Sequence, residues 1–174
     1  HNYVVAQWGP YFSSNPTNTS EEFYGEILRL AKKYIHSDTA ALDVGCAAGR
    51  LVFEFVTLGV HMAVGVDTSK KFISFCNKIK AGKIAEIVYP LDQNSGIFIE
   101  GDIMSSPLLK NAFFSFVSCI NVIDRVKNPS AFIERIVSLS IKDGVALFVD
   151  PYDWAFSPAP KHLHVPDMKV LFEI

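Results

Sequence analysis

Residues 43–50 hold the residue types best suited to binding a charged small molecule, in the order D-V-G-C-A-A-G-R. Asp43 ends an apolar run, and a turn of small residues follows. Small side chains let a ligand approach the backbone closely. The helix expected from Arg50 would add unpaired N–H groups and a positive dipole end. The turn therefore predicts a site for a nucleotide-like ligand.

Two common nucleotide-binding turns do not fit this stretch. A dinucleotide turn has the spacing G-x-G-x-x-G, but Gly45 is followed by Ala47, and Arg50 stands where the third glycine would fall. A P-loop requires Gly-Lys-Ser or Gly-Lys-Thr, which does not follow. The spacing here is D-x-G-x-A-x-G.

Two further acids stand at the ends of expected strands. Asp67 follows the second strand, about 20 residues after the turn, where an acid can accept hydrogen bonds from both ribose hydroxyls. Asp102 follows the third strand in Gly101-Asp102-Ile103. A single aspartate at a strand end is equally typical of a helix cap or a turn. Three of them in register favour a ligand site, because ligands of open α/β sheets bind beyond the carboxyl ends of the strands.

Alternating apolar runs and helical patterns position these acids. We expect strands at 40–44, 62–66, 97–100, 113–120 and 145–149, and helices at about 19–36, 48–58, 69–80 and 129–139. This alternation predicts an α/β fold with a doubly wound, mostly parallel sheet and helices on both faces.

Several local features are predicted around these elements. Thr19 and Glu22 form a capping box at the start of the first helix, and Asp143-Gly144 predicts a turn before the last strand. Residues 1–18 are expected to be irregular apart from a short helical turn. Residues 82–96 should be a connection with one helical turn, and residues 167–174 look helical.

The spacing D-x-G-x-A-x-G resembles motif I of the class I S-adenosylmethionine-dependent methyltransferases, with Ala47 in place of the middle glycine. In that family the aspartate of a Gly-Asp pair after strand 3 accepts from the adenine amino group, and the next apolar residue packs on the ring. The resemblance implies that S-adenosylmethionine is the cofactor and that these residues bind it: Asp43, Gly45, Cys46, Ala47, Gly49, Arg50, Asp67, Thr68, Gly101, Asp102, Ile103 and Asn121.

Two later segments bear on the substrate: N-V-I-D-R at 121–125 and D-P-Y-D-W at 150–154. With A-L-D-V-G-C-A-A-G-R before them, they resemble the methyltransferase domain of ovothiol biosynthesis, which methylates an imidazole nitrogen of a thiohistidine. The resemblance covers about residues 38–155. The chain departs from that pattern at three positions, where it has Val122, Asp150 and Asp153 instead of Leu, Ser and Thr, so the rim of the pocket is more acidic.

The resemblance implies Asn121, Asp124 and Tyr152 as candidate catalytic residues. An imidazole nucleophile needs one nitrogen with a free lone pair and the other N–H held by an acceptor, which fixes the tautomer. Either Asp124 or the Asn121 amide could be that acceptor, and Tyr152 and Trp154 could wall the ring. Asp124 and Arg125 could instead form a local ion pair, and the two aromatic residues could be core or lid packing. Methylation of a protein histidine or of another metabolite, and cofactor binding without turnover, are alternative functions.

The whole chain is expected to be one methyltransferase domain over residues 1–174. Its parts would be a cap segment and helix at 1–37, a cofactor-binding core at 38–150, and a substrate-side loop at 151–174 that lacks the last strands of the sheet.

Composition limits the partners. A net charge of −2 gives no general attraction to nucleic acid, and no apolar stretch reaches the roughly 18 residues needed to span a bilayer. Three widely spaced cysteines favour neither a disulfide framework nor a zinc site, so a reducing cytoplasm and no metal are expected. We expect a small-molecule substrate, without nucleic acid or membrane partners.

Overall fold

A computed structural model describes residues 2–14, 20–87, 96–151, 153–164 and 171–173. Six strands form one sheet in the order β3-β2-β1-β4-β5-β6, in which only β6 is antiparallel to its neighbour. The strands are β1 (Ala40–Val44), β2 (Met62–Asp67), β3 (Ile97–Glu100), β4 (Phe114–Ile120), β5 (Ser140–Val149) and β6 (Leu171–Glu173). The predicted fold class, a mostly parallel sheet with helices on both faces, is confirmed.

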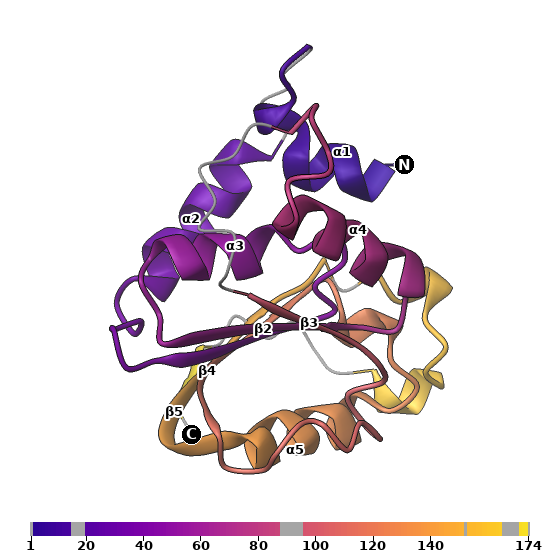
Figure 1. The fold of residues 1–174 in the computed structure, drawn as a ribbon. Coiled ribbons are helices and arrows are strands. Elements are labelled where there is room, and N and C mark those ends of the chain that lie inside the picture. Colours follow the sequence, from indigo (N-terminus) through magenta and orange to yellow (C-terminus); the bar gives the residue numbers. More distant parts are fainter. Residues whose placement is uncertain (1, 15–19, 88–95, 152, 165–170, 174) are drawn as a thin grey trace.

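Helices cover the two faces of the sheet unequally. Figure 1 shows α2 (Glu21–Ala31), α3 (Arg50–Thr57) and α4 (Lys70–Lys80) on one side and α5 (Pro129–Leu139) on the other. The remaining elements are α1 (Asn2–Trp8) and the short 3-10 turns η1 (Gly9–Tyr11), η2 (Ile123–Arg125), η3 (Trp154–Phe156) and η4 (Lys161–Leu163).

Alternation along the strands gives each face its own core. Leu42 and Val44 of β1 pack with α5 residues such as Phe132, whereas Ala41 packs with Ile27 and Phe55 of the opposite helices. Successive side chains of a strand point to opposite faces, so a sheet covered on both sides has nearly continuous apolar strands. This explains why the strands could be recognised as unbroken apolar runs.

The parallel register sets the ends of the strands at one edge. Val44 of β1 lies opposite Val66 of β2 and opposite Cys119 of β4. Asp43, Asp67 and Asn121 are therefore within one or two residues of the same carboxyl edge. The sheet thus positions the residues that were singled out from the sequence.

Three local expectations were wrong or need adjustment. The first helix ends at Ala31 rather than near residue 36, because the next N–H groups bond three residues back (Tyr34 to Ala31) and tighten the chain into turns. The short helical turn expected near the start is longer than predicted, since residues 2–8 form α1. The helix predicted over 167–174 is wrong where the structure describes it, since β6 pairs with the outer edge of β5. A short apolar run does not distinguish strand from helix by periodicity alone.

The predicted turn at Asp143-Gly144 lies inside β5. The register with β4 shifts between Phe114 and Phe116, so the strand absorbs extra residues there. Asp143 adopts φ 63°, which marks the irregularity that the sequence suggested as a turn.

Two predicted features fall partly or wholly on residues outside the described ranges. The first is the capping box, whose Thr19 lies outside these ranges. The N-cap of α2 is Ser20, whose side chain makes no capping hydrogen bond. The 82–96 connection is described only at its two ends, where Ile87 forms an isolated bridge with Phe12.

Candidate functional site

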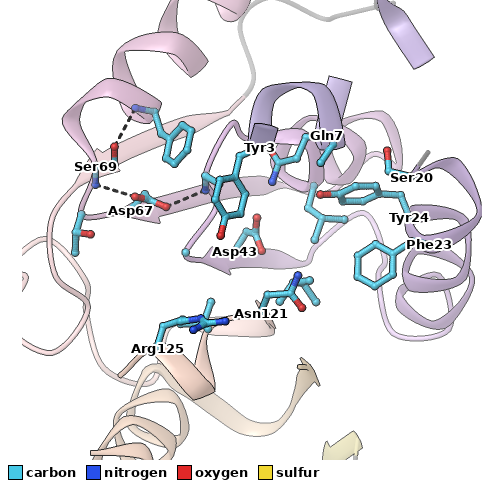
Figure 2. A pocket seen from close by; sticks show the side chains of 18 residues that line it. Tyr3, Gln7, Ser20, Phe23, Tyr24, Asp43, Asp67, Ser69, Asn121 and Arg125 are labelled. Carbon is cyan, nitrogen blue, oxygen red and sulfur yellow. Dashed lines mark hydrogen bonds between the residues drawn. The ribbon is translucent and has the colours of Figure 1, made fainter. Parts of the chain in front are cut away.

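A cavity of about 590 Å³ lies at the carboxyl edge of β1, β2 and β4. The sheet side supplies Asp43, Asp67 and Asn121, and α1 and α2 cover the cavity from above (Figure 2). Of the residues predicted from the sequence, those that line it are Asp43, Gly45, Ala47, Asp67, Thr68 and Asn121.

The Asp43 carboxylate is buried beneath this cavity, 4% exposed. Its Oδ1 accepts a hydrogen bond from the Ser118 hydroxyl at 2.7 Å, across the β1–β4 pair. Burial raises the pKa of Asp43 to about 7, although the Ser118 hydrogen bond lowers it, and the nearby Asp67 carboxylate raises it further. A cationic ligand group above Asp43 would favour its ionised form.

The turn after β1 is held in a conformation that demands small residues. Gly45 has φ +69° and Gly49 has φ +84°, both in the left-handed region. A Cβ on Gly45 would lie 2.6 Å from Val122 Cγ2, and one on Gly49 would lie 2.8 Å from Cys76 Sγ. Both glycines are therefore required by backbone conformation and by close packing.

The Asp67 carboxylate, at the end of β2, holds the turn after β1 by a hydrogen bond. Its Oδ2 accepts from the Ala47 N–H at 2.9 Å and its Oδ1 from the Ser69 N–H at 2.7 Å. A carboxylate offers about four lone-pair sites, so two remain for ligand hydroxyl groups. Thr68 lines the cavity beside it.

Other predicted cofactor residues lie away from the cavity lining. Cys46 is buried with its sulfur against Gly65, and the hydrogen bond with the Cys76 thiol and then burial raise its pKa. Asp102 is exposed and accepts from the Met104 N–H at 2.9 Å, as a turn cap, after Gly101. Ile103 is buried in the core on the α5 side. Adenine contacts from Gly101, Asp102 and Ile103 remain predictions.

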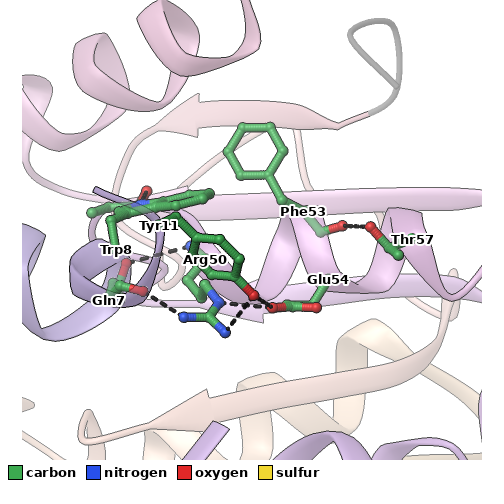
Figure 3. Close-up of polar contacts among 8 residues, drawn as sticks. Gln7, Trp8, Tyr11, Arg50, Phe53, Glu54 and Thr57 are labelled. Atoms are coloured by element: carbon green, nitrogen blue, oxygen red, sulfur yellow. Dashed lines mark hydrogen bonds and ion pairs between the residues drawn. The ribbon is translucent and has the colours of Figure 1, made fainter. Parts of the chain in front are cut away.

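Arg50 also points away from the cavity, into a buried polar network (Figure 3). It is 2% exposed, and its Nε pairs with Glu54 at 2.7 Å. Nη1 donates to the Gln7 carbonyl at 2.7 Å, and the guanidinium lies 4.5 Å from the Tyr11 ring centre and 4.9 Å from that of Tyr24. Arg50 therefore ties α1 and η1 to the start of α3.

The three candidate catalytic residues are placed very differently. Asn121 lines the cavity with φ 57°, and its N–H donates to the Val149 carbonyl at 2.7 Å. Asp124 is fully buried outside the lining, with Arg125 Nε 3.2 Å from its Oδ1, as in the ion-pair interpretation. Burial raises the pKa of Asp124, as does the nearby Asp150 carboxylate, while Arg125 lowers it. Tyr152 lies outside the described residues.

Trp154 and His164 form a separate contact. Their rings stack with centroids 4.4 Å apart, and neither lines the cavity. Trp154 thus packs within the C-terminal segment, which agrees with its interpretation as a packing residue rather than as a wall of the substrate site.

The sequence reasoning predicted a cap segment and helix at 1–37 but assigned none of its residues to the site. Tyr3 and Gln7 of α1 and Phe23 and Tyr24 of α2 line the cavity. Burial raises the pKa of Tyr24, and so does the Asp43 carboxylate, so its hydroxyl stays protonated. The available signal was the aromatic pair Phe23-Tyr24 directly after the acidic residues at the start of α2.

Across the described ranges, no group of three or more His, Cys, Asp or Glu side chains is placed to hold a metal ion. None of the helices described there combines the length and apolar character needed to cross a bilayer.

The family follows from this fold and site. A family model described as a methyltransferase domain matches residues 18–169, so the chain belongs to that methyltransferase domain family. No curated protein sequence matches the chain.

Solved structures show the same fold. The YcgJ protein of Bacillus subtilis superposes with a TM-score of 0.61 at 20% identity, over 72% of this chain and 50% of that one. The PH0226 protein of Pyrococcus horikoshii has a TM-score of 0.63 at 19% identity, over 85% and 65%. A SAM-dependent methyltransferase of Methanosarcina mazei has a TM-score of 0.58 at 18% identity, over 68% and 55%. The chain thus spans between half and two thirds of the length of these structures.

S-adenosylmethionine is the cofactor of this class, and the cavity fits it. The cavity falls within the usual range for ligand pockets, roughly 300–1,000 Å³. Asp67 has lone pairs left for the ribose hydroxyls, and the buried Asp43 faces the cavity where a cationic ligand group would offset its burial. The small residues of the 45–49 turn leave the backbone open to a ligand.

Proposed function

We propose that the protein N-methylates the imidazole ring of a small histidine derivative such as a thiohistidine, using S-adenosylmethionine. The observation that carries the proposal is the position of Asn121 at the floor of the cavity, facing the aromatic cover of Phe23 and Tyr24 (Figure 2). Its carboxamide oxygen can accept the N–H of an imidazole whose other nitrogen is the nucleophile. We further propose that residues 1–174 form one methyltransferase domain in a cytoplasmic protein, in keeping with three free cysteines among the described residues.

Between the two acceptors that the sequence left open, the geometry favours Asn121. Asp124 is fully buried outside the cavity, whereas Asn121 lines it. The left-handed backbone of Asn121 and the hydrogen bond from its N–H to the Val149 carbonyl fix the position of the backbone from which the side chain extends. Asparagine adopts this conformation more readily than most residues.

When bound, the cofactor supplies an electrophilic methyl group: the ring nitrogen lone pair forms the N–C bond, and the S–C electrons stay on sulfur. Orientation and exclusion of water provide most of the rate in such a displacement. Tyr3, Phe23 and Tyr24 would exclude water, and the Asn121 oxygen would hold the second ring N–H while positive charge develops on the ring. The product then loses that proton to solvent.

The test is a methyl-acceptor panel read by mass spectrometry, with histidine, thiohistidine, a histidine-containing peptide and non-imidazole amines. We expect methylation of a free imidazole compound. Asn121→Gly removes the acceptor but tolerates φ 57°, and should lower kcat/KM by about 10- to 100-fold, the value of a hydrogen bond to a charged group. Asn121→Asp keeps an acceptor and should retain most activity.

Asn77→Ala on the exposed side of α4 is the matched control and should change nothing. S-adenosylhomocysteine affinity, measured by calorimetry in the wild type and Asn121→Gly, tests the predicted contact of Asn121 with the cofactor separately from its role as acceptor. Methylation of no imidazole compound, or full activity of Asn121→Gly, would rule out the proposal.

A further inference from the structure

Arg125 is the one cation among the described residues that line the cavity. The other charged residues there are Asp43 and Asp67. Arg125 lines the cavity, and its side chain is 44% exposed. An anionic group of a ligand would therefore meet Arg125.

A buried carboxylate holds this guanidinium from behind. Asp124 is fully buried, and its Oδ1 lies 3.2 Å from Arg125 Nε. The next acid, Asp153, is 3.9 Å from Nη2, beyond hydrogen-bond distance. Asp124 engages Arg125 at Nε as an ion pair, which leaves the terminal nitrogens of the guanidinium, and these suit bidentate binding of a carboxylate.

We propose that Arg125 binds the α-carboxylate of the methyl acceptor, so that the acceptor is a free amino acid rather than a residue within a protein. This inference rests on the proposed function. Figure 2 shows Asn121 and Arg125 on the same side of the cavity, where they can hold the ring and the carboxylate of one histidine-like molecule. Asp124 is then a positioning residue that acts through Arg125.

A carboxylate at Arg125 has a second possible source, the methionyl group of the cofactor. S-adenosylhomocysteine carries this carboxylate and methylthioadenosine lacks it, so their affinities separate the two sources. Thiohistidine and thiohistamine differ in the same way on the acceptor side.

The experiment measures KM and kcat for thiohistidine and thiohistamine with the wild type, Arg125→Gln, Arg125→Lys and Asp124→Asn. We expect Arg125→Gln to raise the KM for thiohistidine about 10- to 100-fold, since a charge-assisted bidentate contact is lost. Its kcat, and both constants for thiohistamine, should change little. Arg125→Lys keeps the charge without the fork and should be intermediate. Asp124→Asn should raise the same KM.

Arg29→Gln is the control, because Arg29 is an exposed arginine of α2 paired with Glu26 and should have no effect. Circular dichroism checks that each variant folds, and Arg125→Lys replaces Arg125→Gln if the latter does not. In calorimetry, Arg125→Gln should bind S-adenosylhomocysteine and methylthioadenosine as tightly as the wild type does.

Two outcomes overturn the inference while leaving the proposed imidazole methylation intact. One is equal use of thiohistidine, thiohistamine and a histidine-containing peptide by the wild type. The other is a weakened affinity of Arg125→Gln for S-adenosylhomocysteine but not for methylthioadenosine, with acceptor KM unchanged, which assigns Arg125 to the cofactor. If the wild type methylates no imidazole compound, the proposed function fails and the inference with it.

Discussion

Asp43 is the residue whose chemistry depends most on its surroundings. Its carboxylate is buried under the cavity, and burial raises its pKa to about 7. A ligand cation above it stabilises the ionised form, and a protonated Asp43 offers no such attraction. We therefore expect the affinity for S-adenosylmethionine to fall as the pH is lowered through about 7.

Calorimetry at a series of pH values tests this expectation. Asp43→Asn should bind more weakly and show a flatter profile. Ser118→Ala removes the hydrogen bond that lowers the pKa of Asp43, so the midpoint of its profile should move to higher pH. A wild-type affinity that does not change between about pH 5.5 and 8.5 would contradict the assigned protonation.

The same shift has a consequence for stability without ligand. The folded-state pKa of Asp43 is above its ordinary value of 3.8. The contribution of the buried neutral acid is therefore fully present below about pH 4 and is lost as the pH rises through about 7. The free energy of unfolding should accordingly fall across this window in the wild type, and less so in Asp43→Asn.

The sequence predicted where residues lie in the fold better than it predicted where their side chains point. The strand-end acids Asp43 and Asp67 line one cavity because parallel register brings strand ends together. Arg50 follows the same motif but turns into the core, because its partners Gln7 and Tyr11 come from a segment about 40 residues earlier in the chain. Asp124 is likewise buried. Motif spacing says nothing of such long-range packing.

At the level of elements, β1, β3 and α5 are the parts of the fold that the local sequence specifies best. The predicted limits of β1, β3 and α5 agree with the structure, and Ser69, at the predicted start of its helix, caps α4 by accepting from the Phe72 N–H at 3.4 Å. Apolar runs bounded by Gly, Pro and Ser define these elements locally. Elements such as β6 and α1 depend on partners distant in sequence, and local patterns did not predict them.

Gly49, the N-cap of α3, allows a controlled test of the turn that joins β1 to α3. Gly49 and Gly59 have nearly the same φ, +84° and +82°. A Cβ on Gly49 would meet Cys76 and Phe98 at 2.8 Å, whereas one on Gly59 would meet nothing within 4 Å. Gly59→Ala should cost about 1–2 kcal/mol for the left-handed backbone alone. Gly49→Ala should cost a further 1–3 kcal/mol or so for overpacking, and should weaken S-adenosylhomocysteine binding.

Urea unfolding of the two variants measures this difference, and calorimetry measures the affinity. Because the backbone strain is matched, the excess loss in Gly49→Ala reports packing between the turn, α4 and β3. Equal losses in the two variants would show that Cys76 and Phe98 move aside, and that close packing does not explain this glycine.

On the scale of the whole molecule, the N-terminal segment 2–12 and the sheet together make the cavity. The segment contributes Tyr3, Ala6 and Gln7 to its lining. It is held to the glycine turn by the Trp8 indole, which donates to the Ala48 carbonyl at 2.8 Å, and by the buried Arg50. The conformation of the glycine turn and the position of the segment that covers the cavity are therefore linked.

Arg50→Gln tests this link, because Arg50 holds the N-terminal segment but does not itself line the cavity. It leaves Glu54 buried without its cation, and we expect a loss of about 3–5 kcal/mol in stability. The exposed pair Arg29–Glu26 is the matched control, and Arg29→Gln should cost less than about 1 kcal/mol. The double variant with Glu54→Gln should recover part of the loss, since no unpaired charge then remains buried.

Hydrogen exchange distinguishes an attachment from a purely structural ion pair. If Arg50 holds the cover in place, amides of residues 2–11 in Arg50→Gln should exchange faster, relative to those of β1 and β4, than in the wild type. Its S-adenosylhomocysteine affinity should fall as well, because the cover would have to be ordered when the ligand binds. In the wild type, saturating S-adenosylhomocysteine should slow exchange in that same segment. Uniformly faster exchange over the whole chain, with affinity retained, would instead assign Arg50 to global stability alone.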